Sequence, residues 1–352
     1  MDPSTAATPA PRLGALVLSL APGLLLAAAV AFSADRVGGW EASLSQLWLG
    51  RPVAIAPPVI ALLIGIALHG VAARPQFTPG SSFAIKKVLR WAIALFGLNI
   101  AFADIRGLGL ASAAMVILTM IATLAAGLLF ARLFRLGDAF GALAGAACAV
   151  CGASAALATS SVLPDSRDRE TNTAFVVITT NLIATFAVVA YPAWCAFVGF
   201  DDRTTGIFLG ASIHDVAQVV GAGYSVSKTA GNIALVVKLF RVFLLLPVVL
   251  GVGWFFARQG AEVGKAKVPV PVFALMFLVF VAINSSGLMP PFAKEALLTA
   301  SRWGLLLALA ALGLNTSLAS IARVGLKPVL AVGLTTAVVF ALPAAWLATM
   351  GH

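Results

Sequence analysis

Charged side chains are scarce in this sequence. They make up 10% of the 352 residues, whereas hydrophobic residues make up 61% and the mean hydropathy is +1.03. A soluble globular domain carries about 25% charged residues. The composition therefore excludes an ordinary soluble domain. It indicates an all-α polytopic membrane protein, in which the 32 glycines fit close helix packing and broken helices.

Cysteines and basic tracts are also few, and each shortage excludes a class of function. Cys148 and Cys151 form a C-x-x-C motif, but the one other cysteine is Cys195, so packing is favoured over redox or metal chemistry. We expect no metal site and no cofactor. The net charge is +10, yet no basic tract with interleaved aromatic residues occurs, which excludes nucleic acid as a partner.

Apolar runs account for most of the chain. We expect about eleven transmembrane helices, at residues 13–32, 53–70, 88–104, 107–131, 138–163, 172–199, 204–227, 231–257, 269–287, 302–319 and 325–349. The first run is longer than a usual signal-peptide core, so we expect a retained helix after a disordered tail at 1–12. Residues 13–350 then form a single transmembrane transporter domain with repeat-like halves at about 53–199 and 204–349.

The lysines and arginines of alternate loops predict the orientation. With a cytoplasmic N-terminus, the cytoplasmic loops carry thirteen of them and the outer loops carry eight. This excess predicts a multi-pass protein of the cell inner membrane, with the N-terminus in the cytoplasm and the C-terminus outside.

Two internal repeats are visible. Residues 90–99, ending in Gly-Leu-Asn, return with four extra residues at 302–315, and the Gly-Ala-Ser at 152–154 returns at 210–212. Copies of the first repeat would cross in opposite directions, as in an alternating-access transporter, so we expect inverted repeats and broken helices. Asn99 and Asn315 end these copies and are expected to line a central cavity or to bind backbone groups at helix breaks.

Two basic residues, Lys238 and Arg241, lie on one helix face inside the apolar run 231–257. Arg241 is roughly 15 Å from the start of that run, near the middle of a hydrocarbon core about 30 Å thick. A cation at that depth costs on the order of 2.5–3.5 kcal/mol on insertion scales. We expect the pair to attract an anion, either a transported one or an internal carboxylate. Snorkelling is the alternative, and it suits Lys238 better than Arg241.

Small and ionisable residues interrupt two other apolar runs. Broken helices at the Gly-Ala-Ser elements would expose backbone N–H groups, so substrate binding is predicted there, with tight packing as the alternative; the residues are Gly152, Ser154, Gly210 and Ser212. His214 and Asp215 are predicted to couple transport to protons. Alternatively, Asp215 neutralises Lys238 or Arg241 as a fixed buried pair. Asn181 is expected on a cavity face.

These motifs resemble the YeiH-type sulfate exporter family of bacterial inner-membrane proteins. The resemblance covers about residues 15–350 and rests on four segments: 151–157, 210–223, 238–241 and the Gly-Leu-Asn at 97–99. It implies export of sulfate or a small sulfonate-like anion. It also implies a distant similarity to bile-acid symporters and sodium/proton antiporters, which have two inverted five-helix repeats. The extra N-terminal run and the order of the repeats depart from that plan.

We therefore predict a secondary active exporter of a small anion, coupled to protons and not an enzyme. Its partners are the anion and the lipid bilayer, and a homodimer stays open. One alternative is a sodium-coupled organic-anion symporter of the bile-acid type, with asparagines and carbonyls holding Na⁺. The other is an intramembrane enzyme using Cys151, His214 and Asp215, against which the sequence shows no orienting triad at a fixed spacing.

Overall fold

The computed structural model describes residues 13–49, 56–259, 271–316 and 325–349, and every regular element in these ranges is a helix. Six of the described helical stretches are long and apolar enough to cross a bilayer, and four shorter apolar helices accompany them. The all-helical membrane class is thus confirmed, whereas the count of eleven separate spans is not. The tail expected at residues 1–12 lies outside the described ranges.

Helices suit an apolar solvent because they satisfy their backbone hydrogen bonds internally. In chain order the elements are α1 (Leu13–Leu49), α2 (Pro57–Ala67), α3 (His69–Ala72), α4 (Thr78–Phe83), the π-helix η1 (Ala84–Val88), α5 (Leu89–Phe96), the 3-10 turn η2 (Gly97–Asn99), α6 (Phe102–Gly107), α7 (Gly109–Leu133), α8 (Asp138–Ala149), α9 (Ala153–Ser160), α10 (Arg169–Val198), α11 (Asp202–Ser212), α12 (Val216–Val226), α13 (Lys228–Phe243), α14 (Leu245–Arg258), α15 (Val272–Ser286), α16 (Pro291–Leu314) and α17 (Leu326–Thr349).

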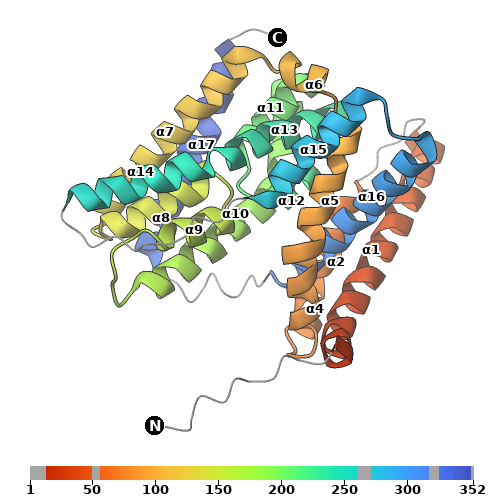
Figure 1. Ribbon diagram of the computed structural model, residues 1–352, viewed down its shortest axis with the longest axis horizontal. Helices are drawn as coiled ribbons and strands as arrows, with labels where there is room; N and C mark the ends of the chain where they lie inside the picture. The colour runs from red at the N-terminus through yellow and green to blue at the C-terminus, as the bar shows by residue number, and fades with distance from the viewer. Residues whose placement is uncertain (1–12, 50–55, 260–270, 317–324, 350–352) are drawn as a thin grey trace.

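The helices pack in two groups (Figure 1). The scaffold group comprises α1, α2, α4, α5, α15 and α16, and the core group comprises α7 to α14 together with α17. Helix α12 of the core group also contacts α2 and α16, so it lies between the two groups. Close approach in the scaffold depends on glycine: a Cβ on Gly65 would lie 2.6 Å from the carbonyl oxygen of Ala310, too close to be tolerated.

The first sequence repeat forms two neighbouring scaffold helices. Its copies lie on α5–η2 and on α16, and the Ser301 hydroxyl of α16 donates a 2.6 Å hydrogen bond to the carbonyl of Ala92 on α5. The helices end at the last residues of the copies, η2 at Asn99 and α16 one residue before Asn315, which is earlier than the expected run ends at 104 and 319. Contact between the copies places the symmetry-related helices side by side in the scaffold.

Helices α8 and α9 form a hairpin that folds back on itself. The start of α8 and the end of α9 both lie beside the first turns of α10, because Phe140 stacks on Phe175 and Thr173 donates to Ser160. The turn between them lies further along α10, where a Cβ on Gly152 would be 3.7 Å from the Thr180 hydroxyl. Both arms of the α8–α9 hairpin therefore open toward the N-terminal end of α10.

Helices α11 and α12 form a second hairpin, which enters from the opposite end of α10. Phe208 of α11 contacts Tyr191 and Trp194 near the C-terminal end of α10, while Gln218, just after the turn, reaches Asn181 in its middle. Along α13, α11 runs parallel and α12 antiparallel, with glycines at the closest approaches: 206 and 210 on α11, 223 on α12 and 231 on α13.

The expected single crossings at 138–163 and 204–227 are therefore corrected. The α8–α9 turn contains Gly152 with φ +63°, a conformation that side-chain-bearing residues rarely adopt. The α11–α12 turn contains extended backbone at Ile213 and Asp215. Apolar composition is the same in a hairpin and in a single span, so periodicity alone did not separate the two.

The two sequence halves follow one plan in a shifted order. The first half runs α2, α5, α7, the α8–α9 hairpin and α10; the second runs the α11–α12 hairpin, α13–α14, α15, α16 and α17. Two pairs of contacts correspond: α7 packs on α8 as α17 packs on α11, and α2 packs on α16 as α15 packs on α5. The second half thus matches the first with its hairpin and following helix moved to the front, which accounts for the order of the sequence repeats.

The hairpin topology can be tested by thiol labelling from one side. In a background with Cys148, Cys151 and Cys195 replaced by alanine, Arg135→Cys and Ser166→Cys flank the first hairpin and should react with an impermeant maleimide from the same face. Arg203→Cys and Thr229→Cys should both react from the other face. Labelling of Arg135→Cys and Ser166→Cys from opposite faces would restore the single-crossing arrangement.

Candidate functional site

The turns of the two hairpins meet in the middle of the core group. A Cβ built on Gly152, in the α8–α9 turn, would lie 3.8 Å from the Cβ of His214, in the α11–α12 turn. Four helix ends converge here: the C-terminal ends of α8 and α11 and the N-terminal ends of α9 and α12. Helices α10, α13 and α17 surround them. We refer to this region as the hairpin junction.

Lys238 of α13 is fully buried and bridges the two hairpins. Its ammonium donates to the carbonyl of Val150 at 2.5 Å and to that of Ile213 at 2.8 Å. These carbonyls follow the last residues of α8 and α11, whose terminal C=O groups have no partner within their own helices.

Arg241 extends the same pattern one turn further along α13. Its guanidinium donates to Cys148 and Ala149 at the end of α8, and to Gly210 and Ile213 at the end of α11, over distances of 2.7 to 3.1 Å. The side chain is 1% exposed, so it does not snorkel. The close approach of α11 and α13 at Gly210 brings these carbonyls within reach.

Backbone carbonyls therefore supply the negative charge that these two cations face. The C-terminal end of a helix carries roughly half a negative charge, and two such ends point at Lys238 and Arg241. Among the described ion pairs, none includes either residue. The alternative in which Asp215 forms a direct ion pair with one of them is therefore not seen among the described contacts, in which both cations donate to backbone carbonyls.

Asp215 instead caps a helix. Its carboxylate accepts a 2.8 Å hydrogen bond from the backbone N–H of Ala217 in the first turn of α12. Aspartate is a preferred N-cap residue because it satisfies one of the free N–H groups there. The sequence signal for this role, an aspartate just before an apolar helical run, is the usual one for a helix start.

The N-terminal end of α9 has no such cap. Its N-cap residue is Gly152, which has no side chain. The thiol of Cys151 accepts from the N–H of Ala155, so the N–H groups of Ala153 and Ser154 are the ones without a described partner. Adding roughly half a charge for each of the four helix ends to the two cations and one carboxylate leaves the hairpin junction with about one positive charge. The uncapped start of α9 is where an anion would meet free backbone donors.

Buried polar side chains with unused hydrogen-bonding atoms adjoin this helix end. His214 Nε2 lies 3.1 Å from the hydroxyl of Thr336 on α17, while its Nδ1 has no partner among the described residues. The Gln218 amide donates to Thr185 and Asn181 of α10, and its Oε1 likewise has none. Buried polar atoms are normally paired, so these two suggest that a ligand or water completes the site.

The structure brings some of the predicted residues together and leaves others apart. Gly152, Gly210, Ser212, His214, Asp215, Lys238 and Arg241 all lie in or beside the two turns. Ser154 lies in the first turn of α9 and is exposed, whereas the Ser212 hydroxyl bonds back to Phe208 of its own helix. Thr336 was missed in the sequence, where it is the second of two adjacent threonines within a largely apolar run.

The two asparagines do not meet. Asn99 donates to Asn232 on α13, which also accepts from Tyr224, and Asn315 donates to Ala311 one turn earlier in α16. Both therefore stabilise helix ends or helix contacts, which is the structural alternative considered for them. The three cysteines are buried and form no disulfide, and the described residues contain no metal-binding group of His, Cys, Asp and Glu.

Comparison with known proteins places this architecture among membrane proteins. Residues 22–332 match the family model described as Conserved hypothetical protein 698. A UPF0324 membrane protein of Rhizobium meliloti is 40% identical over 89% of this chain and 88% of its own length. The UPF0324 membrane protein TauZ of Paracoccus denitrificans is 39% identical over 86% and 90%, and the UPF0324 inner membrane protein YeiH of Salmonella typhi is 33% identical over 81% and 84%.

Proposed function

Because the chain belongs to the UPF0324 family of membrane proteins, we propose that it is a secondary active transporter of a small anion. The observation that carries this proposal is the hairpin junction, where four helix ends and a buried Lys–Arg pair leave about one positive charge far from solvent. Sites of this kind, at broken helices between repeats, bind substrates in many transporters.

The anion would bind at the start of α9, not directly to the two cations. Lys238 and Arg241 already donate to backbone carbonyls, so they act on the anion through their field. The free N–H groups at the start of α9 and the hydroxyl of Ser154 would donate hydrogen bonds to it. A sodium ion would need the backbone carbonyls at the ends of α8 and α11. These carbonyls are already bonded to Lys238 and Arg241, which favours an anion over Na⁺.

The anion we propose is a sulfate or a sulfonate, and a sulfonate carries the single negative charge that matches the net charge of this site. The oxygens of either anion are acceptors only, as the N–H groups of α9 require, and a sulfonate stays ionised at neutral pH. Any coupled proton must therefore travel on the protein. We assign this role to His214 because an imidazole can take up and release a proton, and its Nδ1 has no partner among the described side chains.

The hairpin topology also strengthens the proposed orientation. With both hairpins folding back, Arg167 and Arg169 join the cytoplasmic set and Arg203 joins the outer set. The excess inside is larger than for eleven single crossings. Folding back two runs removes an even number of crossings, so an N-terminus in the cytoplasm of an inner-membrane protein stays consistent.

Reconstituted transport distinguishes anion binding from proton coupling. Proteoliposomes are assayed with sulfate, sulfite, a small sulfonate and a carboxylate, under a pH gradient and in counterflow without one. For the transported anion, His214→Gln should lower gradient-driven accumulation at least tenfold yet keep counterflow, because a glutamine amide can still reach Thr336. Gradient-driven accumulation that survives this substitution would reject His214 as the proton carrier, and transport of none of these anions would reject the proposed function.

A further inference from the structure

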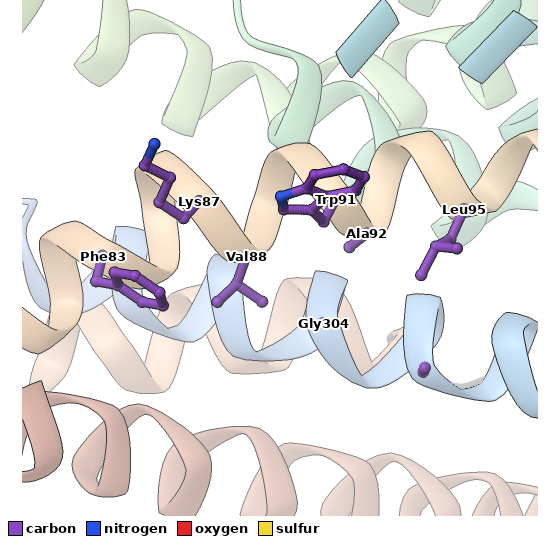
Figure 2. Close-up of a pocket in the computed structure, with 8 residues that line it drawn as sticks. Phe83, Lys87, Val88, Trp91, Ala92, Leu95 and Gly304 are labelled. Atoms are coloured by element: carbon purple, nitrogen blue, oxygen red, sulfur yellow. The ribbon is translucent and has the colours of Figure 1, made fainter. Parts of the chain in front are cut away.

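A surface groove runs along the scaffold group, outside the hairpin junction. It has a volume of about 350 Å³ and lies between η1–α5 and α16 (Figure 2). Its lining residues are Phe83, Lys87, Val88, Trp91, Ala92, Leu95, Ala300 and Gly304. From Phe83 to Leu95 it follows about 18 Å of helix axis. Small residues of both helices make its floor, so the groove is apolar along its length and has one cation, Lys87.

Three cations lie beside the middle of this groove, between Phe83 at one end and Leu95 at the other. Lys86, Lys87 and Arg90 are all exposed, and their side chains make no ion pair or hydrogen bond within the described part of the chain. The two lysines belong to the π-helix η1, a wide turn that is rare and is frequent at functional sites. Figure 2 shows Lys87 and Trp91 on the side of the helix away from α16, with Val88 and Leu95 pointing toward α16.

We propose that this groove binds an anionic phospholipid, with one acyl chain along Val88, Trp91 and Leu95 and the phosphate at the three cations. An apolar groove with unpaired positive charge beside it complements a lipid with an acidic headgroup, and basic pockets between transmembrane helices bind such headgroups. Lysine and arginine stems can extend along apolar surface toward the headgroup region. Tryptophan favours the same boundary between acyl chains and headgroups.

Charge argues against a second copy of the chain as the occupant. A two-fold symmetric interface places the same patch of both subunits together, and here it would bring three unpaired cations against three others. A phosphate group removes that repulsion. The groove therefore fits an acidic lipid better than a symmetric dimer contact, and the assignment does not depend on which anion is transported.

Trp91 makes the site directly measurable, because its side chain is 58% exposed in the groove. The purified protein is placed in nanodiscs of phosphatidylcholine with small amounts of brominated phosphatidylglycerol or brominated phosphatidylethanolamine, and tryptophan quenching is recorded. The part of the quenching that disappears in Trp91→Phe reports on the groove. We expect half-maximal quenching of this part at a phosphatidylglycerol fraction at least fivefold lower than that of phosphatidylethanolamine.

Two variants and one control test the cations and the apolar groove separately. The triple substitution Lys86→Ala, Lys87→Ala and Arg90→Ala should remove the fivefold preference, whereas Lys327→Ala, an exposed cation on α17, should leave it intact. Ala300→Leu should weaken quenching by both lipids by filling the groove. Equal quenching by the two brominated lipids in the unmodified protein would overturn the proposal, as would a preference that survives the triple substitution. Dimers that form without lipid and protect Trp91 would assign the groove to a second copy.

Discussion

Arg241→Ala is expected to abolish transport and to lower the melting temperature of the purified protein by on the order of 10 °C. The substitution leaves the carbonyls of Cys148, Ala149 and Gly210 without the donor that satisfies them at the ends of α8 and α11. A buried polar group left unpaired costs about 1–3 kcal/mol, and each kcal/mol shifts the melting temperature by roughly 2–4 °C in domains of 150–250 residues. The measurement is thermal unfolding in detergent without any substrate anion.

The conservative variant separates charge from hydrogen-bond geometry. Arg241→Lys keeps the positive charge, but one ammonium cannot reproduce a planar fork that reaches two helix ends. We expect about half of the stability loss and a large loss of transport. Lys327→Ala serves as the matched control because that cation is exposed. A normal melting temperature for Arg241→Ala, together with weakened anion affinity, would mean that the guanidinium binds the substrate and not the helix ends.

Gly210→Ala is expected to have the second-largest effect, through a single added methyl group. Its Cβ would lie 2.5 Å from the carbonyl oxygen of Ala234 and 2.7 Å from the Cβ of Val237, so α11 must move away from α13. That shift would also lengthen the Arg241 bond to the Gly210 carbonyl, now 3.1 Å. We expect a loss of roughly 1–3 kcal/mol, typical of overpacking, and strongly reduced transport.

Gly251→Ala provides a control outside the contact between α11 and α13. Gly251 lies in α14, and no heavy atom lies within 4 Å of a Cβ built there, so alanine should be neutral or slightly stabilising in thermal unfolding. If Gly210→Ala and Gly251→Ala have the same melting temperature and transport rate, the contact between α11 and α13 is not what positions the α11–α12 turn.

Sequence reasoning located the centre of this protein without giving its geometry. A charge inside an apolar run needs compensation, so Lys238 and Arg241 could be singled out as buried from their place in that run. Their partners could not be identified, because backbone carbonyls are the same in every residue and become available only where a helix ends. Asp215 was the nearest acidic candidate in the sequence, yet its carboxylate lies at a helix start and serves α12.

The fold was predictable in class and in its repeats, but not in its crossings. The Gly-Leu-Asn repeat indicated two related helices, and these do pack together as α5 and α16. Run 138–163 is apolar throughout, so only the positive φ of Gly152 and the contacts of Phe140 and Ser160 with the start of α10 show that it turns back. Thr336 carried no signal because its partner His214 is far away in sequence.

The frame of this molecule is nearly symmetric, but its charge is not. Helix α10 corresponds to α13–α14 in the repeat, yet between its first turn and its C-terminal end it carries no lysine or arginine. Both hairpins are therefore tethered to the same helix, and neither can swing away from α13 without leaving carbonyls bare in an apolar medium. Because Lys238 and Arg241 bond both hairpins at once, the two hairpins cannot move separately. The hairpins and α13 should therefore move as one rigid body relative to the scaffold group.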